Sequence, residues 1–307
     1  MASQVSWIGL GNMGRGMCKN IIEKGSLKSP LIVYNRTAAR AHSLVESFPK
    51  GKATVATTIA DAVKPADLIF ICVGDDAASD NVIKEAIESG DVKGKLFVDC
   101  STVHPDTTRK TSQTLTEKGA SFVSCPVFGA PAFADAGQLV SVLAGKKEDV
   151  DKVKPFTTGV TSRTIIDLSD QEIGRASMLK VLGNSFILST IETLSEGLVL
   201  AEKSGLGTDT YHQWLELFFP GAFPKYSTRM TSGDYYQREY PLFAVDLARK
   251  DLRHALSLAS SSGVHLPSAE VADGLLKEVK EHDGEKGDVA GIYGALRQHS
   301  GLKYENQ

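Results

Sequence analysis

The chain has 307 residues, of which 42% are hydrophobic and 23% charged, and this length and composition predict a protein that folds throughout, most simply as two domains. Its 34 basic and 37 acidic residues give a net charge of −3 without a run of Lys or Arg, which argues against nucleic acid as a partner. No apolar stretch reaches the roughly 20 residues of a membrane-spanning helix, and the N-terminus lacks the features of a secretion signal, so a cytoplasmic protein with no membrane partner is expected.

The first motif is a glycine-rich loop. Residues 7–20 are WIGLGNMGRGMCKN, in which three glycines fit the pattern G-x-G-x-x-G. A strand is expected over 5–10 and an amphipathic helix over 13–23, and this context favours nucleotide binding over its alternative, a tight turn without a ligand. Glycines let the backbone approach a pyrophosphate, and the N–H groups that open the helix bind anions. The expected cofactor contacts are Gly9, Leu10, Gly11, Asn12, Met13 and Gly14.

Strands and helices alternate through the rest of the first half. Short, continuous apolar runs separated by helical patterns are typical of buried parallel strands. Strands are expected at 31–36, 66–73, 95–101, 121–127 and 139–145, and helices at 38–47, 77–89 and 105–118. This alternation predicts an α/β fold, with a Rossmann-type doubly wound domain over residues 1–168.

The end of the second expected strand bears on the choice of cofactor. Enzymes that use NAD commonly place Asp or Glu there, to accept hydrogen bonds from the ribose 2′-OH. This chain has Asn35, Arg36 and Thr37 instead, and a guanidinium without a neighbouring carboxylate suits a 2′-phosphate. NADP(H) is therefore favoured over NAD(H); the alternative is an exposed arginine with no ligand.

After residue 168 the strand pattern stops, and residues 171–203 contain no proline and predict one long helix. Lys180 and Asn184 lie one turn apart on its apolar stripe, which continues through Ile187, Ile191, Leu194 and Leu198. A lysine in that place can bury its stem and extend its ammonium to water. It can equally serve a functional site, because Asn184 could orient the ammonium or a substrate by hydrogen bonding. Position alone leaves both interpretations open.

The remaining residues predict further helices at 208–218, 243–262 and 267–282, with a loop over 219–241. Residues 169–307 are therefore expected to form an all-helical domain, and a small ligand is expected in the cleft between the two domains.

The cysteines and histidines carry no recognisable metal or disulfide motif. The four cysteines, Cys18, Cys72, Cys100 and Cys125, match neither a zinc site nor a disulfide framework, and we expect them to be small buried residues near strand ends. The seven histidines are scattered, so no metal site is expected.

Four motifs in order resemble those of the β-hydroxyacid dehydrogenase family, the group related to 6-phosphogluconate and 3-hydroxyisobutyrate dehydrogenases. They are GLGNMGRGMCKN in the glycine loop, DCSTVHP at 99–105, GRASMLKVLGN at 174–184, and KDL at 250–252, preceded by Phe243 and Leu247. The resemblance covers nearly the whole chain. It implies a Rossmann domain, a long interdomain helix, a helical C-terminal domain and dimers or tetramers. The long interdomain helix and the apolar C-terminal helices favour a homodimer.

The resemblance also implies roles for individual residues. Lys180 would be the proton donor when a carbonyl is reduced and would assist proton removal when an alcohol is oxidised, while Asn184 would hold the substrate or the lysine. The other expected contacts are Val73, Thr102 and Lys250 to the cofactor, and Ser101, Thr102, Phe128, Gly129 and Ala130 to the substrate. Ser101 and Thr102 could instead cap the helix that follows, and Lys250 could be a solvated helix lysine.

The chain departs from the family pattern at two positions. Where the family commonly has A-P-V-S-G-G, residues 125–130 are CPVFGA, so Phe128 replaces a serine that usually helps to hold the substrate carboxylate. Ala176 replaces the second glycine of the catalytic-helix motif. Because Phe128 removes a hydroxyl and adds an apolar ring, we expect a less polar or differently shaped substrate than 3-hydroxyisobutyrate.

These features predict an NADP(H)-dependent oxidoreductase that acts on a small molecule. It would interconvert a β-hydroxyacid with its aldehyde or keto form, or reduce a small aldehyde or keto acid such as a semialdehyde. One alternative is an imine reductase, which shares this architecture but usually carries Asp or Tyr in place of the lysine. Another is an NADP(H)-binding sensor or scaffold without activity, although such relatives tend to lose the lysine that Lys180 matches.

Overall fold

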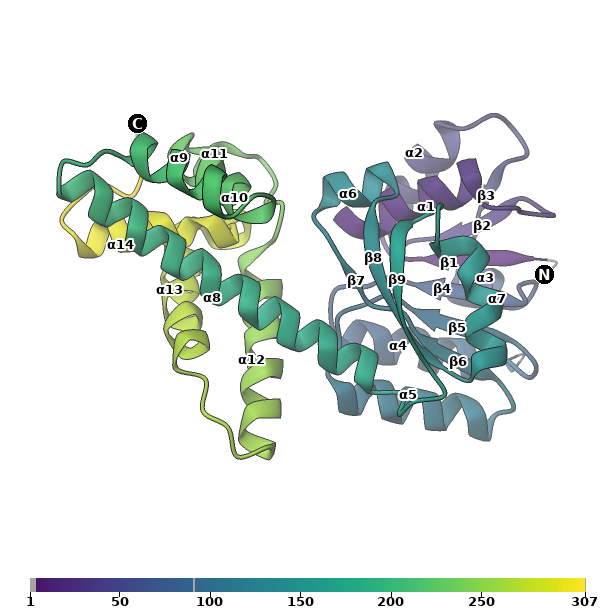
Figure 1. The fold of residues 1–307 in the computed structure, drawn as a ribbon. Coiled ribbons are helices and arrows are strands. Elements are labelled where there is room, and N and C mark those ends of the chain that lie inside the picture. The colour runs from purple at the N-terminus through teal and green to yellow at the C-terminus, as the bar shows by residue number, and fades with distance from the viewer. Residues whose placement is uncertain (1–3, 91, 307) are drawn as a thin grey trace. The chain divides into compact units, whose positions relative to one another are not determined.

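A computed structural model describes residues 4–90 and 92–306 and divides the chain into two compact units (Figure 1). The units are Met1–Lys180, called here the N-terminal unit, and Val181–Gln307, the helical unit. The division falls inside one helix, α8 (Arg175–Lys203), which begins four residues later than the sequence predicts. The division thus lies later in the chain than the domain boundary expected after residue 168, and the first turns of α8, with Lys180, are part of the N-terminal unit.

The described residues of the N-terminal unit form one nine-stranded sheet, in the order β3-β2-β1-β4-β5-β6-β8-β7, with β9 paired to β8. The strands are β1 (Val5–Ile8), β2 (Leu31–Tyr34), β3 (Ala53–Val55), β4 (Leu68–Ile71), β5 (Leu96–Asp99), β6 (Ser121–Ser124), β7 (Val127–Phe128), β8 (Leu139–Gly145) and β9 (Ser162–Ser169). All pairs from β3 to β6 are parallel. The order reverses direction between β1 and β4, which confirms the doubly wound α/β fold.

Helices cover both faces of this sheet (Figure 1). They are α1 (Asn12–Lys24), α2 (Ala38–Glu46), α3 (Ile59–Val63), α4 (Asp76–Glu88), α5 (Pro105–Glu117), α6 (Pro131–Ala136) and α7 (Lys147–Thr157). Alternate residues of β4 serve opposite faces, as the two-residue period of a strand requires. Leu68 and Phe70 pack in the core shared by α1, α2, α6 and α7, whereas Ile69 and Ile71 pack in the core shared by α3, α4 and α5.

Several elements of the N-terminal unit differ from the sequence prediction. The sequence analysis did not predict five elements, β3, α3, α6, α7 and β9. Strand β9 was not recognised because much of it is exposed and it lacks a continuous apolar run. The single strand expected over 121–127 is two strands, interrupted at Cys125 and Pro126. Strand β8 pairs antiparallel with both of them. The cysteine prediction was wrong for Cys18, which lies inside α1 rather than near a strand end.

The helical unit contains α9 (Thr208–Phe218), α10 (Ala222–Thr231), α11 (Asp234–Gln237), α12 (Val245–Ser261), α13 (Pro267–Asp283) and α14 (Ile292–His299), together with two short 3-10 turns, Gly284–Lys286 and Val289–Gly291. The predictions for α9, α12 and α13 are confirmed within two residues at each end. Apolar residues of α8, among them Ile191 and Leu198, are fully buried in this unit's core against Tyr235 and Tyr293.

The loop expected over 219–241 was wrong, because α10 and α11 lie there. Glycine, proline and aromatic residues obscure the helical pattern locally, but Met230 of α10 and Tyr235 of α11 are buried in the core. Arg229 of α10 also forms an ion pair with the buried Asp288, far along the chain. These helices are therefore stabilised by tertiary contacts that local propensity does not reveal. Helix α14 was also missed by the sequence analysis.

Candidate functional site

The glycine loop connects β1 to α1, and two of its glycines are required by the protein's own packing. Gly9 has φ +102°, and a Cβ placed there would lie 2.2 Å from the carbonyl oxygen of Cys72. A Cβ at Gly14 would lie 2.3 Å from the carbonyl oxygen of Gly9. Any larger residue at either position would force the backbone to move.

Gly11 differs from these two glycines. Its φ of −70° suits any residue, and a Cβ there would meet no atom within 4 Å. The protein's own packing therefore does not explain this glycine. Gly11 is the N-cap of α1 and provides no side-chain cap, so the start of the helix, with its N–H groups and positive dipole end, lies beside open space. This arrangement fits the pyrophosphate of a dinucleotide.

Asn35 and Arg36 follow β2, the strand that pairs with β1. The Leu10 N–H donates to Oδ1 of Asn35 at 2.8 Å, and Nδ2 of Asn35 donates to the Thr37 carbonyl at 3.0 Å. Asn35 thus ties the glycine loop to the end of β2. Arg36 is exposed, and within residues 4–90 and 92–306 its guanidinium has no hydrogen bond or ion pair. Arg36 therefore leaves a positive charge available beside the loop.

Val73 and Ser101 connect the ends of β4 and β5. The Val73 N–H donates to Oγ of Ser101 at 2.9 Å, and the Ser101 N–H donates to Oδ1 of Asp99 at 2.8 Å. Burial raises the pKa of Asp99, although hydrogen bonds from Ser101 and Ser79 oppose the effect. Ser101 is buried, whereas Thr102 is half-buried. Neither residue caps α5, because its N-cap is His104, so the capping alternative is wrong.

Lys180 lies in α8 near residues at the carboxyl ends of the strands. Its Nζ is 4.6 Å from the ring centroid of Phe128, the last residue of β7. Burial raises the pKa of the Cys72 thiol to about 12, and the positive charge of Lys180 opposes that rise. A Cβ at Gly14 would lie 3.4 Å from Cβ of Cys72, so Cys72 adjoins the glycine loop and is also within electrostatic reach of Lys180. Gly129 and Ala130, which follow Phe128, are exposed.

The helical unit holds Asn184 and Lys250, together with a residue that the sequence analysis missed. Nδ2 of Asn184 donates to Oδ2 of Asp251 at 2.6 Å, and Nζ of Lys250 lies 3.0 Å from Oδ1 of the same carboxylate. All three residues are buried, so Lys250 is not the solvated lysine of the alternative interpretation. The signal for Asp251 was present in the KDL motif, where only the lysine was singled out.

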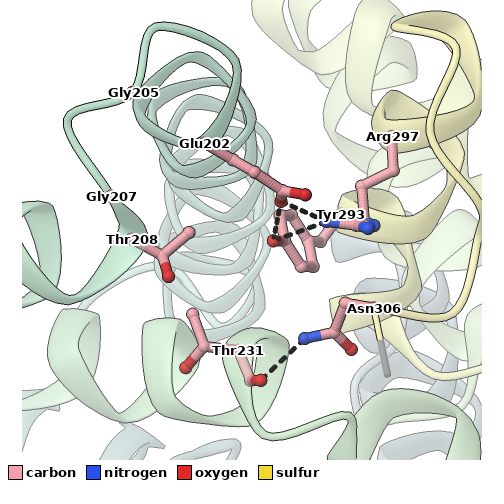
Figure 2. A pocket seen from close by; sticks show the side chains of 8 residues that line it. All are labelled: Glu202, Gly205, Gly207, Thr208, Thr231, Tyr293, Arg297 and Asn306. Atoms are coloured by element: carbon pink, nitrogen blue, oxygen red, sulfur yellow. Dashed lines mark hydrogen bonds and ion pairs between the residues drawn. The ribbon is translucent and has the colours of Figure 1, made fainter.

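A separate cavity of about 430 Å³ lies within the helical unit (Figure 2). Its lining residues are Glu202, Gly205, Gly207, Thr208, Thr231, Tyr293, Arg297 and Asn306, and none belongs to the predicted site. Figure 2 shows that its polar groups bind one another. Arg297 forms an ion pair with Glu202 and donates to the Tyr293 hydroxyl at 3.2 Å, and Asn306 donates to the Thr231 carbonyl at 2.6 Å.

Comparisons with known proteins define the family. Residues 4–167 match the NAD binding domain of 6-phosphogluconate dehydrogenase, and residues 174–296 match the NAD-binding domain of NADP-dependent 3-hydroxyisobutyrate dehydrogenase. The chain belongs to the β-hydroxyacid dehydrogenase family. As a member of this family it is an NAD(P)-dependent oxidoreductase, either a dehydrogenase or a reductase.

Individual relatives of the chain align with it over most of their length. It is 33% identical to an NADH-dependent oxidoreductase of Aspergillus ustus, over 95% of this chain and 98% of the relative. It is 30% identical to glyoxylate/succinic semialdehyde reductase 1 of Arabidopsis thaliana, over 90% and 92% of the two chains. The structure of Mycobacterium tuberculosis 3-hydroxyisobutyrate dehydrogenase with L-serine has the same fold, with a TM-score of 0.81 at 19% identity, and covers 97% of this chain and 100% of that one.

Two features are absent from the part of the chain that the structure describes. Among residues 4–90 and 92–306, no helix has the length and apolar character needed to cross a membrane. In the same residues, no group of three or more His, Cys, Asp or Glu side chains is arranged to hold a metal ion.

Proposed function

We propose that this β-hydroxyacid dehydrogenase uses NADP(H) to interconvert a β-hydroxyacid with its aldehyde or keto form, with Lys180 as the general acid and base. One observation carries the proposal. The Lys180 ammonium lies 4.6 Å from the ring of Phe128, the last residue of β7, and it acts on the thiol of Cys72, whose Cβ adjoins Gly14 of the glycine loop. These contacts support a place for Lys180 near the loop where a dinucleotide fits.

The chemistry divides between the cofactor and the chain. The nicotinamide, when bound, supplies or accepts the hydride. In the reductive direction, Nζ of Lys180 donates a proton to the carbonyl oxygen, and an ammonium beside the developing alkoxide stabilises it. In the oxidative direction the neutral amine accepts the hydroxyl proton.

Other residues would position the reactants. Asp251 holds the Asn184 amide in one orientation, which supports a role for Asn184 in aligning the substrate or Lys180. We assign substrate contacts to Ser101, Thr102, Gly129 and Ala130, and cofactor contacts to Val73, Thr102 and Lys250. The Ser101 hydroxyl accepts from the Val73 N–H and its side chain also bonds to Asp99, so its contribution to a substrate would be the second lone pair of its oxygen, which accepts a hydrogen bond.

The preference for NADP(H) rests on the end of β2. Asn35 presents an amide in place of a carboxylate, and the Arg36 guanidinium is exposed without a protein partner among the described residues. Both features suit a 2′-phosphate. The A. ustus relative is named for NADH, so the preference has to be measured for this chain. We expect Arg36→Ala to weaken NADPH binding at least tenfold while NADH binding changes little; equal losses for both cofactors would contradict the assignment.

The substrate is expected to be a small carbonyl compound or its alcohol. The A. thaliana relative is named for glyoxylate and succinic semialdehyde, which supports an aldehyde bearing a carboxylate. Phe128 removes the hydroxyl that commonly holds that carboxylate, so we expect a substrate with more apolar surface than 3-hydroxyisobutyrate. Phe128→Ser should then raise kcat/KM for small 3-hydroxyacids, and no change would remove Phe128 from the substrate pocket.

The first experiment is NADPH oxidation by the purified protein with a panel of carbonyl compounds, each repeated with NADH. The panel is glyoxylate, succinic semialdehyde, methylmalonate semialdehyde, a bulkier keto acid and a cyclic imine. Turnover of a carbonyl compound with NADPH supports the proposal. Preferential turnover of the imine would favour an imine reductase, and tight NADPH binding without turnover would favour a sensor or scaffold.

We also propose that the chain forms a homodimer through an aromatic patch on the helical unit. Exposed apolar side chains gather on α8 and α9, and apolar patches of this kind mark protein interfaces. The patch comprises Leu182, Phe186, Trp214, Leu217, Phe218 and Phe219. Neighbouring rings stack on one another, with centroids 5.7 Å apart for Trp214 and Phe218. We expect Leu217→Glu to convert a dimer to monomers in sedimentation velocity; a wild-type monomer would contradict the proposal.

A further inference from the structure

An aromatic ring faces the ammonium of Lys180. The distance of 4.6 Å from Nζ to the ring centroid of Phe128 is within the range of about 6 Å over which a cation is attracted to the face of an aromatic ring. Both residues belong to the N-terminal unit. The ring is half-buried, so water screens the contact less than it would screen an exposed pair.

The position of the ring is set by the sheet. Phe128 pairs with Val140 of β8, and its side chain packs in a small apolar cluster with residues of β8 and α8, among them Val142, Ala144 and Ala176. Gly129 follows with φ +137°, and a Cβ there would lie 2.7 Å from Leu139. The backbone is therefore constrained on both sides of the ring, which fixes the place of Phe128 at the end of β7.

Titratable groups also follow the neighbouring strands. Burial raises the pKa of Cys72, after β4, to about 12, and a hydrogen bond with Cys125 and burial raise that of Cys100, after β5, so these two thiols are neutral near pH 7. Cys125 follows β6. Asp99 of β5 is buried and accepts hydrogen bonds from Ser79 and Ser101. Beside these groups, the ring of Phe128 is a contact of the Lys180 ammonium with a defined distance.

We propose that Phe128 is a positioning residue that holds the Lys180 ammonium over its ring and favours the protonated lysine, which equips the enzyme for carbonyl reduction. The inference rests on the proposed function, because it assigns Lys180 the role of proton donor. In that reaction a hydride adds to the carbonyl carbon, and the N–H bond of Lys180 breaks as its proton moves to the carbonyl oxygen. The lysine is left as a neutral amine and regains its proton from water. A serine at position 128 would bind the substrate but would not attract the ammonium in this way.

The test removes the ring face while keeping the apolar volume. In Phe128→Leu the attraction to the ammonium is lost, so the pKa of Lys180 should fall, whereas Phe128→Tyr keeps the ring and should restore it. Phe48→Leu is the control, because Phe48 is also half-buried but lies after α2. Competitive labelling of the cofactor-free protein with acetic anhydride across pH, followed by mass spectrometry of the Lys180 peptide, reports the ionisation midpoint directly.

We expect Phe128→Leu to lower the labelling midpoint of Lys180 by roughly 0.4 to 1.5 pH units. The alkaline limb of kcat/KM for NADPH-dependent reduction should move to lower pH by the same amount, because the donor loses its proton earlier. Phe128→Tyr and Phe48→Leu should leave both quantities near the wild-type values. If Phe128→Leu does not accumulate as folded protein, Phe128→Met makes the same change with a more adaptable side chain.

Three outcomes separate this inference from the proposed function. An unchanged midpoint in Phe128→Leu, or an equal fall in Phe128→Tyr, would overturn the inference and leave the proposed function standing. A change in KM alone, with the pH profile and midpoint unchanged, would show that the ring only shapes the pocket and would overturn it as well. Normal turnover by Lys180→Ala would instead overturn the proposed function.

Discussion

The N-terminal unit and the helical unit bring their candidate functional residues together in different ways. In the N-terminal unit, the glycine loop, Asn35, Val73 and Ser101 each follow one of the parallel strands of the sheet, so the topology places them along one edge. In the helical unit, Asn184 and Asp251 lie on different helices, 67 residues apart, and are joined by one hydrogen bond. A regular sheet thus makes the positions of site residues predictable from the sequence, whereas a site in a helical unit depends on particular long-range pairs.

The largest effect is expected from Lys180→Ala in the N-terminal unit. Loss of a general acid lowers turnover by about 10² to 10⁴-fold, and kcat should fall in that range. Because Lys180 has no place in the glycine loop, the Kd for NADPH measured by fluorescence should change little. Lys203→Ala, at the exposed end of the same helix, is the matched control and should retain wild-type turnover. Near-normal kcat in Lys180→Ala would refute its assigned role.

Asp251→Ala tests the hydrogen-bonded pair of the helical unit, Asn184 and Asp251. The substitution removes the shared acceptor of Asn184 and Lys250, and a buried charge left without its partner costs about 3 to 5 kcal/mol. We expect the free energy of unfolding in urea to fall by about that amount, together with kcat. Asp251→Asn keeps an acceptor for Asn184 while losing the charge, so it separates the two contributions. An unfolding free energy unchanged by Asp251→Ala would show that the pair has no stabilising role.

Gly9 and Gly11 of the glycine loop are expected to respond differently to substitution by alanine. Gly9→Ala would strain a backbone with φ +102° and bring Cβ to 2.2 Å from the Cys72 carbonyl oxygen, which should cost at least about 1 to 3 kcal/mol of stability. Gly11→Ala places a methyl group in open space, so stability should be nearly unchanged while NADPH binding weakens tenfold or more. Thermal unfolding and a cofactor titration measure both effects. Wild-type NADPH affinity in a folded Gly11→Ala variant would contradict the assigned pyrophosphate site.

The smallest effect concerns the buried Asp99 and its dependence on pH. Burial raises the pKa of Asp99 above the ordinary value of 3.8, so the folded state favours the neutral carboxyl. The stability that this residue contributes is fully present below pH 3.8 and is lost as the pH rises through the folded-state pKa. Asp99→Asn cannot titrate. The difference in the free energy of unfolding, Asp99→Asn minus wild type, should therefore increase as the pH rises above 3.8. Urea unfolding at several pH values checks this, and a difference that stays constant with pH would contradict it.

Local sequence patterns predicted the elements and motifs that depend only on residues close together in the chain. Apolar runs and their periods located most strands of the sheet and the long helix α8, since side-chain alternation and helical spacing are local properties. The glycine spacing predicted the loop that joins β1 to α1, and the order of four motifs identified the family. The site residues Lys180 and Asn184 were also visible, because they share one helical stripe.

Contacts between residues far apart in the chain became visible only in the folded protein. The pattern over 219–241 resembles a loop, yet α10 and α11 form there because Met230 and Tyr235 are buried in the core of the helical unit. Likewise, no local spacing reveals that Asp251 binds Asn184 or that Phe128 faces Lys180. Gly9 and Gly11 look alike in the sequence, and only the packing around them separates a glycine that the fold requires from one that leaves room for a ligand. These contacts depend on chain segments brought together by folding, so a pattern of neighbouring residues carries no record of them.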